Sequence, residues 1–127
     1  MKIKFRFGFS RKKEQADDCV FCKIINDEIP SKKLYEDEEC LAFYDINPLA
    51  EKHFLVVPKR HIVSAAALEE DDEELVGHIF GVIAKLTKQL EFTDGFRVVT
   101  NCGKIAGQTV PHLHFHVLGG QELGSFN

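Results

Sequence analysis

The stretch that most constrains this chain is PHLHFHVLGG, residues 111–120, in which histidine alternates with apolar residues. Successive side chains of a β-strand point to opposite faces of its sheet. The alternation therefore predicts a strand with His112, His114 and His116 on one face and apolar side chains on the other. A rise of about 3.3 Å per residue separates the first and third histidines by about 13 Å. Because Zn–N bonds are only about 2.0–2.1 Å long, one ion cannot easily bind all three, and the histidines must have separate roles.

The remaining patterns predict one domain of the α+β class. The chain has 127 residues, 44% of them hydrophobic and 28% charged, which is enough to bury a core without disulfides. Residues 71–91 carry an apolar stripe at helical spacing and begin with acidic residues, as expected of a long helix. We expect Asp17 or Asp18 to cap a shorter helix in CVFCKII. The expected strands are KLYED, CLAFYD, HFLVVPK, FRVVTN and HLHFHVL, so an antiparallel sheet packs with two helices.

Charge is distributed unevenly along the chain. The first 13 residues contain six basic residues and no acidic one, which leaves ten basic residues against twenty acidic ones in the remainder. We expect residues 1–16 to be a basic extension, either an exposed strand or a charged tail, and residues 17–127 to be the single domain. The acidic body argues against a nucleic-acid partner, which needs a basic surface. No apolar run has membrane-spanning length and no apolar leader is present, so we expect a cytoplasmic protein with no membrane partner.

A glycine-containing loop, NCGKIAGQTV, precedes the histidines. Gly103 and Gly107 allow the backbone to approach a ligand closely, and free amides there could face an anion. Asn101 and Thr109 add polar side chains. Imidazole is a nucleophile and a general acid or base near neutral pH. The loop and the histidines together predict a phosphate site beside groups that can act on phosphorus.

Four cysteines are present, and without a secretory context they do not predict disulfides. We expect Cys40 and Cys102 to be small buried residues. Cys19 and Cys22 form a C-x-x-C pair, which could be a redox pair or half of a zinc site. A thioredoxin-like pair follows a strand in a βαβ unit, whereas this one precedes a hairpin. His78, between apolar positions of the long helix, is expected to be structural.

These segments resemble a known family. GQTVPHLHFHVLGG is similar to the histidine triad signature, and FCKIINDEIPSKKLYEDEECLAFYDINP, HFLVVPKRHI and NCGKIAGQTV resemble the histidine triad nucleotide-binding proteins. The likeness covers about residues 19–120, and the final Gly119 and Gly120 resemble the purine nucleoside phosphoramidase branch. The resemblance implies the HIT-like fold, with a sheet of about five strands, one long helix and one short helix. It also implies a homodimer whose sheets join, with a purine nucleoside monophosphate in each site.

The resemblance implies a reaction as well. His114 would attack the α-phosphorus of a purine nucleoside phosphoramidate, such as AMP-NH2 or lysine-linked AMP, to form a nucleotidyl-histidine that water then hydrolyses. His116 would orient the phosphate and pass protons, and His53 would orient the catalytic histidine. The residues implied for the phosphate are Asn101, Gly107, Gln108, Thr109 and His116. Those implied for the nucleoside are Phe21, Ile24, Phe43, Asp45 and Ile46. Thr109 stands where the family usually has serine.

Many bacterial members of the family look like this chain in having the ligands of a structural zinc site, whereas others replace the cysteines and do without metal. The resemblance assigns Cys19, Cys22, His61 and His112 as the tetrahedral zinc ligands, with no cofactor required for the chemistry. The tail QELGSFN lacks the tryptophan and prolines of animal members, which leaves the specificity for the amine open. Three alternatives also stay open: a dinucleoside polyphosphate hydrolase, a nucleotide-binding interaction module with incidental hydrolysis, and a zinc-stabilised redox or structural protein.

Overall fold

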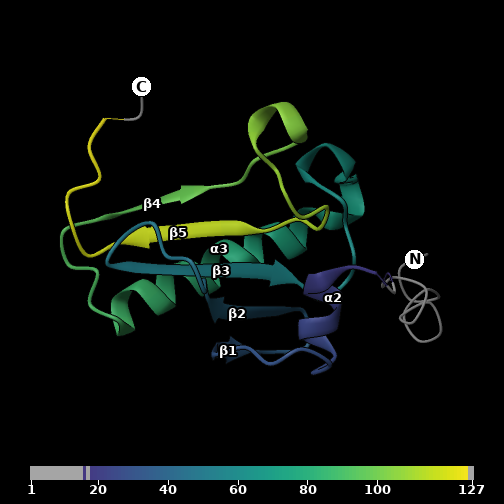
Figure 1. Cartoon of the computed structure of the whole chain (residues 1–127), viewed down its shortest axis with the longest axis horizontal. Helices are drawn as coiled ribbons and strands as arrows, with labels where there is room; N and C mark the ends of the chain where they lie inside the picture. Colours follow the sequence, from purple (N-terminus) through teal and green to yellow (C-terminus); the bar gives the residue numbers. More distant parts are fainter. Residues whose placement is uncertain (1–15, 17, 126–127) are drawn as a thin grey trace.

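A computed structural model of the protein describes residue 16 and residues 18–125. Five strands form one antiparallel sheet in the order β1-β2-β3-β5-β4 (Figure 1). The strands are β1 (Lys33–Glu36), β2 (Cys40–Tyr44), β3 (Lys52–Pro58), β4 (Phe96–Val99) and β5 (Phe115–Gly119). The helices are α2 (Val20–Ile25) and α3 (Glu73–Gln89), with 3-10 turns η2 (Ala65–Ala67), η3 (Glu70–Asp72) and η4 (Lys104–Ala106). The predicted α+β class is confirmed, whereas the features expected of residues 1–15 and 17 lie outside the described residues.

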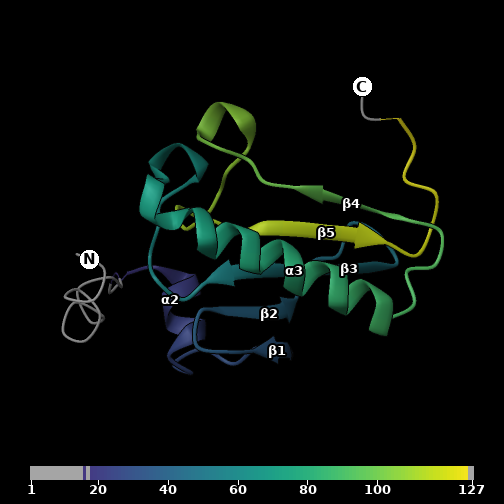
Figure 2. The same ribbon diagram turned by 180° about the vertical axis from the view of Figure 1, so that it is seen from behind.

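The two faces of the sheet are covered by different helices. α3 crosses one face, as Figure 2 shows, and α2 lies on the other at one end of β2 and β3. Side chains of β3 alternate accordingly: Phe54 and Val56 pack with α3, while Leu55 and Val57 pack with α2. β5 repeats the alternation, because Phe115 and Val117 lie in the core beneath α3. The histidine side of β5 therefore lies on the face that carries α2.

The two helices begin differently from the sequence prediction. α3 starts at Glu73, after the 3-10 turn η3, which a capping box between Glu69 and Asp72 stabilises. Arg60 forms an ion pair with the buried carboxylate of Asp72. The cap of α2 is Cys19 rather than Asp18. The backbone of Cys19 is extended, and its Sγ accepts the N–H of Cys22 at a distance of 3.3 Å.

Two further predictions need correction. The last strand begins at Phe115 rather than His112, since the N–H of Leu113 donates to Ile62 O at 2.6 Å, outside the strand pairing. Cys40 is fully buried as expected, but Cys102 is exposed because it lies on the glycine-containing loop. None of the helices formed by the described residues combines the length and apolar character that a bilayer crossing requires.

Candidate functional site

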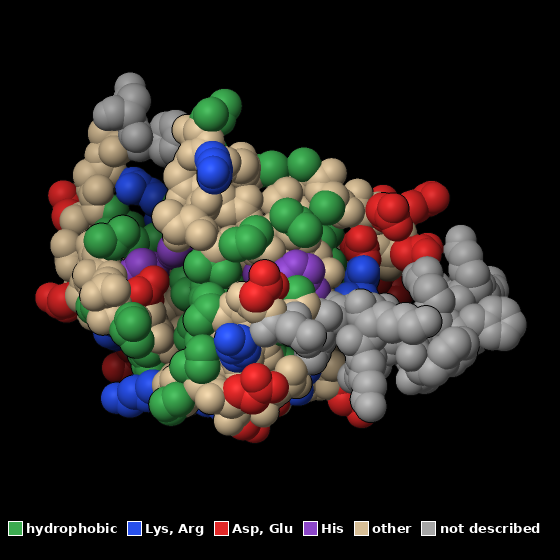
Figure 3. Space-filling model, turned by 45° about the vertical axis from the view of Figure 1, so that its right-hand side comes forward, with side chains coloured by type: hydrophobic (Ala, Val, Ile, Leu, Met, Phe, Trp, Pro, Cys, Tyr) green, Lys and Arg blue, Asp and Glu red, His purple; other side chains and the backbone are tan. Residues whose placement is uncertain are grey.

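The three histidines of the triad share one region of the α2 face. His112 and His114 are buried, at 0% and 5% exposure, and His116 is half-buried. The rings of His114 and His116 lie 5.0 Å apart, and the ring of Phe21 contacts both His112 and His114 edge-on. In Figure 3, histidine side chains reach the surface in two places, each beside hydrophobic side chains. The site is therefore a row of imidazoles with one end more open than the other.

The protonation of His114 follows from a single hydrogen bond. Its Nδ1 lies 2.7 Å from the carbonyl oxygen of His112. A carbonyl oxygen can only accept, so in the neutral ring of His114 the proton is on Nδ1 and Nε2 has a free lone pair. Nε2 of His114 is consequently a nitrogen that could attack an electrophile.

A second chain of hydrogen bonds places the proton of the neutral His116 ring on Nε2, the nitrogen that is unprotonated in His114. The backbone N–H of Leu49 donates to Nδ1 of His53 at 3.0 Å, so the proton of the neutral His53 ring is on Nε2. This Nε2–H donates to Nδ1 of His116 at 2.9 Å, with a carboxylate oxygen of Asp45 at 3.5 Å. The proton of His116 is then on Nε2. His114 thus presents a lone pair and His116 presents a donor.

Burial favours the neutral forms of His116 and His53. It lowers the pKa of His116 to about 4, and the neighbouring His114 and His53 act in the same direction. Burial also lowers the pKa of His53, which the charge of Asp45 partly opposes. In the free protein at neutral pH, the neutral forms of His116 and His53 are therefore the relevant ones.

A second cluster joins α2 to the start of the triad. Nδ1 of His112 lies 3.3 Å from Sγ of Cys19, 3.6 Å from Sγ of Cys22 and 3.2 Å from Nδ1 of His61. Sγ of Cys22 lies 3.4 Å from the same His61 nitrogen. A tetrahedral zinc ion with bonds of about 2.0–2.3 Å would place two nitrogens about 3.3 Å apart and a sulfur and a nitrogen about 3.6 Å apart. The four ligand atoms fit that geometry.

The surroundings of the cluster support the same ion. Nε2–H of His112 donates to Pro58 O at 2.9 Å, which leaves the lone pair on Nδ1, as in metal-bound histidines generally. Both sulfurs accept backbone N–H groups, Cys19 from Cys22 and Cys22 from Ala16. Burial raises the pKa of the Cys22 thiol to about 11, so without an ion it is not the activated thiolate of a redox pair. The donor set fits a closed structural zinc site.

Two other groups of potential ligands among the described residues fit a metal poorly. One group contains Asp45, His53 and His116. Nδ1 of His53 accepts the N–H of Leu49, so the proton of the neutral ring is on Nε2, and Nε2 has no lone pair to offer a metal.

The other group contains Asp37, Cys40 and His78. The Asp37 carboxylate already accepts the N–H groups of Glu39 and Cys40 and the hydroxyl of Tyr35. Nε2 of His78 also bonds to it at 2.6 Å, which ties α3 to the β1–β2 turn.

The glycine-containing loop has a more closed backbone than expected. Gly103 and Gly107 adopt φ angles of 88° and 92°, which only glycine adopts readily. The N–H of Gly107 donates to Lys104 O at 3.0 Å, and that of Gln108 donates to Gly103 O at 3.1 Å. The sequence predicted that the N–H groups of Gly107 and Gln108 face phosphate. Instead both donate to carbonyl oxygens of the loop, because the loop closes into the η4 turn.

Side chains complete the description of the loop. The amide of Gln108 accepts from Gly103 N and donates to Val63 O and Val110 O, so it builds the loop. Among the hydrogen bonds between described residues, none involves the side chains of Asn101 or Thr109. Those two side chains remain available to an anion.

The predicted nucleoside residues divide into three environments. Phe21 and Ile24 of α2 are buried against Phe43 of β2, with the rings of Phe21 and Phe43 5.7 Å apart. Asp45 follows β2 and lies beside His53, and one of its oxygens accepts the Asn47 N–H. Ile46, at 88% exposure, projects into solvent. Phe21 is the member of this set in ring contact with His114.

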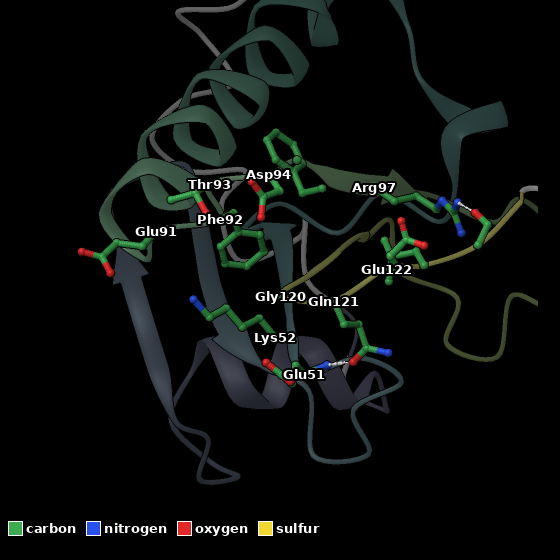
Figure 4. Close-up of a pocket in the computed structure, with 14 residues that line it drawn as sticks. Glu51, Lys52, Glu91, Phe92, Thr93, Asp94, Arg97, Gly120, Gln121 and Glu122 are labelled. Atoms are coloured by element: carbon green, nitrogen blue, oxygen red, sulfur yellow. Dashed lines mark hydrogen bonds between the residues drawn. The ribbon is translucent and has the colours of Figure 1, made fainter.

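A pocket of about 890 Å³ lies away from these residues, at the C-terminal end of α3 (Figure 4). Its wall includes the chain after β5, which is tethered by Arg97 donating to Gly124 O and by Glu51 N donating to Gln121 Oε1. None of the predicted site residues lines it. The pocket is therefore separate from the histidine row.

Sequence comparison identifies the family. The family model described as HIT domain matches residues 26–123, which is most of the chain. The chain belongs to the HIT domain family. The match begins after Cys19 and Cys22, so the cysteine half of the candidate metal site lies outside it.

Individual HIT proteins are similar over most of their length. An uncharacterized HIT-like protein of Methanocaldococcus jannaschii is 51% identical over 102 residues, which cover 79% of this chain and 77% of that protein. A histidine triad protein from Clostridium difficile is 48% identical with a TM-score of 0.86, covering 89% of this chain and 99% of that chain. A HIT family hydrolase from Clostridium thermocellum is 44% identical with a TM-score of 0.85, covering 87% and 97%.

Three groups in the site were not identified from the sequence: the Leu49 N–H, the Pro58 carbonyl and the Thr100 hydroxyl, which donates to His114 O. Two of them are main-chain groups, which any residue offers, so no residue type could have indicated them. The third belongs to a threonine in a predicted strand, where threonine is common.

Proposed function

We propose that this HIT protein hydrolyses the P–N bond of purine nucleoside phosphoramidates. The observation that carries the proposal is the pairing of a lone pair on Nε2 of His114 with a proton on Nε2 of His116, in rings 5.0 Å apart. A nucleophile next to a proton donor is what displacement of an amine from phosphorus requires. The similar Clostridium thermocellum protein is described as a hydrolase, which agrees with this reaction class.

The reaction proceeds in two displacements. Nε2 of His114 attacks the α-phosphorus, and the P–N bond to the amine breaks. In this complex the negative charge of the bound phosphate favours the protonated form of His116, which donates Nε2–H to the leaving nitrogen and becomes neutral. The resulting nucleotidyl-His114 is a cation whose Nδ1–H remains bonded to the His112 carbonyl oxygen, which stabilises the charge. Water then attacks phosphorus, returns a proton to His116 and releases the nucleoside monophosphate.

The substrate would lie between the loop and α2. Asn101 and Thr109 would bind phosphate oxygens together with His116, and the backbone near Gly107 and Gln108 would shape the loop around them. Phe21, Ile24, Phe43 and Ile46 would contact the base, and Asp45 would accept hydrogen bonds from the ribose hydroxyls. A zinc ion held by the Cys19–Cys22–His61–His112 cluster would supply a structural cross-link between α2 and the triad.

We also propose a homodimer in which two sheets join. β4 is an edge strand of the sheet, and an exposed phenylalanine, Phe96, begins it. α3 exposes Gly77, Phe80, Gly81 and Ala84 at the spacing of one helix face, with Phe80 at 46% exposure. Small residues beside an exposed aromatic ring suit close packing with a second copy, and an edge strand suits pairing with its equivalent. A Phe80→Glu variant that stays dimeric in light scattering would contradict this interface.

Release of AMP from three substrates tests the proposed reaction. AMP-NH2, lysine-linked AMP and diadenosine polyphosphates are compared under identical conditions. The proposal predicts rapid cleavage of the two P–N substrates and slow cleavage of the polyphosphates. Preference for polyphosphates would instead identify a dinucleoside polyphosphate hydrolase, and binding of AMP without any turnover would identify a nucleotide-binding module.

A further inference from the structure

The nucleophile candidate lies where the regular pairing of strands has ended. Val99 of β4 is paired with His116 of β5, and the pairing of these two strands stops there. His114 precedes β5, so its main chain is not held by that pairing. Another group must therefore hold its carbonyl oxygen.

That group is the side chain of Thr100. Its Oγ1–H donates to His114 O at 2.8 Å, in the position where a continuing strand would supply a backbone N–H. Thr100 directly follows β4 and directly precedes Asn101, which is proposed to bind phosphate. One hydroxyl thus connects the start of the proposed phosphate loop to the main chain of the proposed nucleophile.

We propose that Thr100 is a positioning residue that sets His114 at the correct distance and direction from the bound phosphate. The inference rests on the proposed function and adds a residue to it. Thr100 does not touch the phosphorus; it acts through the His114 main chain.

Two hydrogen bonds to His114 together determine the direction of its ring. The ring is held through Nδ1–H to His112 O, and the residue's own carbonyl is held by Thr100. If the second bond is lost, the peptide that follows His114 can rotate, and Nε2 moves relative to Asn101. Attack on phosphorus requires an aligned lone pair at near-contact distance, and a displacement of about 1 Å can reduce the rate about 100-fold.

The test compares Thr100→Val, which removes the hydroxyl at nearly constant volume, with Thr100→Ser, which retains it. Thr87→Val is the control, because the hydroxyl of Thr87 likewise donates to a main-chain carbonyl, Ile83 O at 2.9 Å, but Thr87 lies in α3. For Thr100→Val we expect kcat on AMP-NH2 to fall about 10- to 100-fold with little change in KM. Thr100→Ser and Thr87→Val should retain kcat within about threefold, since neither removes the bond to His114.

A merely structural role for Thr100 predicts a different pattern. It would lower the thermal midpoint of Thr100→Val and leave kcat, measured well below that midpoint, unchanged; this result would overturn the inference. Equal loss of kcat in Thr100→Val and Thr100→Ser would also overturn it, because the hydroxyl would then be irrelevant.

The nitrogen NMR spectrum of the His114 ring gives a second readout that needs no turnover. In wild type with AMP bound, the Nδ1–H tautomer should dominate, and Thr100→Val should populate the other tautomer or broaden the signal. An unchanged spectrum with unchanged AMP affinity would overturn the positioning role. If wild type cleaves no phosphoramidate while this spectrum changes as expected, the proposed reaction fails and the positioning of His114 by Thr100 stands.

Discussion

The carbonyl oxygen of His112 accepts the Nδ1–H of His114 at 2.7 Å, while Nδ1 of the same His112 faces Cys19 at 3.3 Å. One residue therefore contributes its side chain to the candidate metal cluster and its main chain to the tautomer of the candidate nucleophile. This relationship explains how alternate histidines on one face can have separate roles. It also means that the metal cluster and the nucleophile are adjacent parts of one structure.

Replacement of the proposed nucleophile tests the center of this arrangement. His114→Ala should reduce kcat at least about 1,000-fold, because no other lone pair takes its place. Affinity for AMP should remain close to wild type, since the proposed phosphate and base contacts come from other residues. Steady-state kinetics and calorimetric titration with AMP measure the two quantities. Loss of AMP affinity in a folded His114→Ala protein would contradict the roles assigned here.

The bond between His53 and His116 leads to a second prediction. Nε2–H of His53 donates to Nδ1 of His116 at 2.9 Å, and His53→Gln removes this hydrogen bond. His116 can then lose the Nε2–H tautomer, and kcat should fall about 10- to 100-fold, within the range for general acid–base groups. His78→Gln is the matched control, because that exposed histidine bonds to Asp37 and lies outside the site. Equal kcat in wild type and His53→Gln would show that the His53 bond does not matter for the reaction.

Periodicity and residue type predicted much of the molecule. The alternation of residues 112–117 separated the histidines from Phe115 and Val117, and the structure buries those two beneath α3. The four metal ligands that the family resemblance assigned also lie together, with their ligand atoms within 4.8 Å of one another. The groups that set the tautomers, such as the Leu49 N–H and the Pro58 carbonyl, could not be found this way, because every residue has a backbone. The prediction that Cys102 is buried was wrong, because an apolar side chain on a loop is a poor indicator of burial.

The stability of the protein should depend on His116 in mild acid. Burial lowers the pKa of His116 to about 4, compared with about 6.5 for an unperturbed histidine. Between these values the unfolded chain binds more protons than the folded one, so the free energy of unfolding falls as the pH falls from about 6.5 toward 4. His116→Asn removes this titration, and its free energy of unfolding should fall less steeply over the same window. Urea denaturation at several pH values measures both slopes; parallel curves for the two proteins would contradict the prediction.

The metal cluster provides the last prediction. The protein should contain about one zinc ion per chain, since four ligands complete one tetrahedral site. Cys22→Ser should lose the ion and lower the thermal midpoint by at least about 5 °C, which corresponds to about 1–2 kcal/mol in a domain of this size. The matched control is Cys102→Ser, because Cys102 is exposed and outside the cluster, and it should keep both the zinc content and the midpoint. Elemental analysis and calorimetry measure the two effects. A metal-free wild-type protein with reactive Cys19 and Cys22 thiols would show that the cluster is held by hydrogen bonds alone.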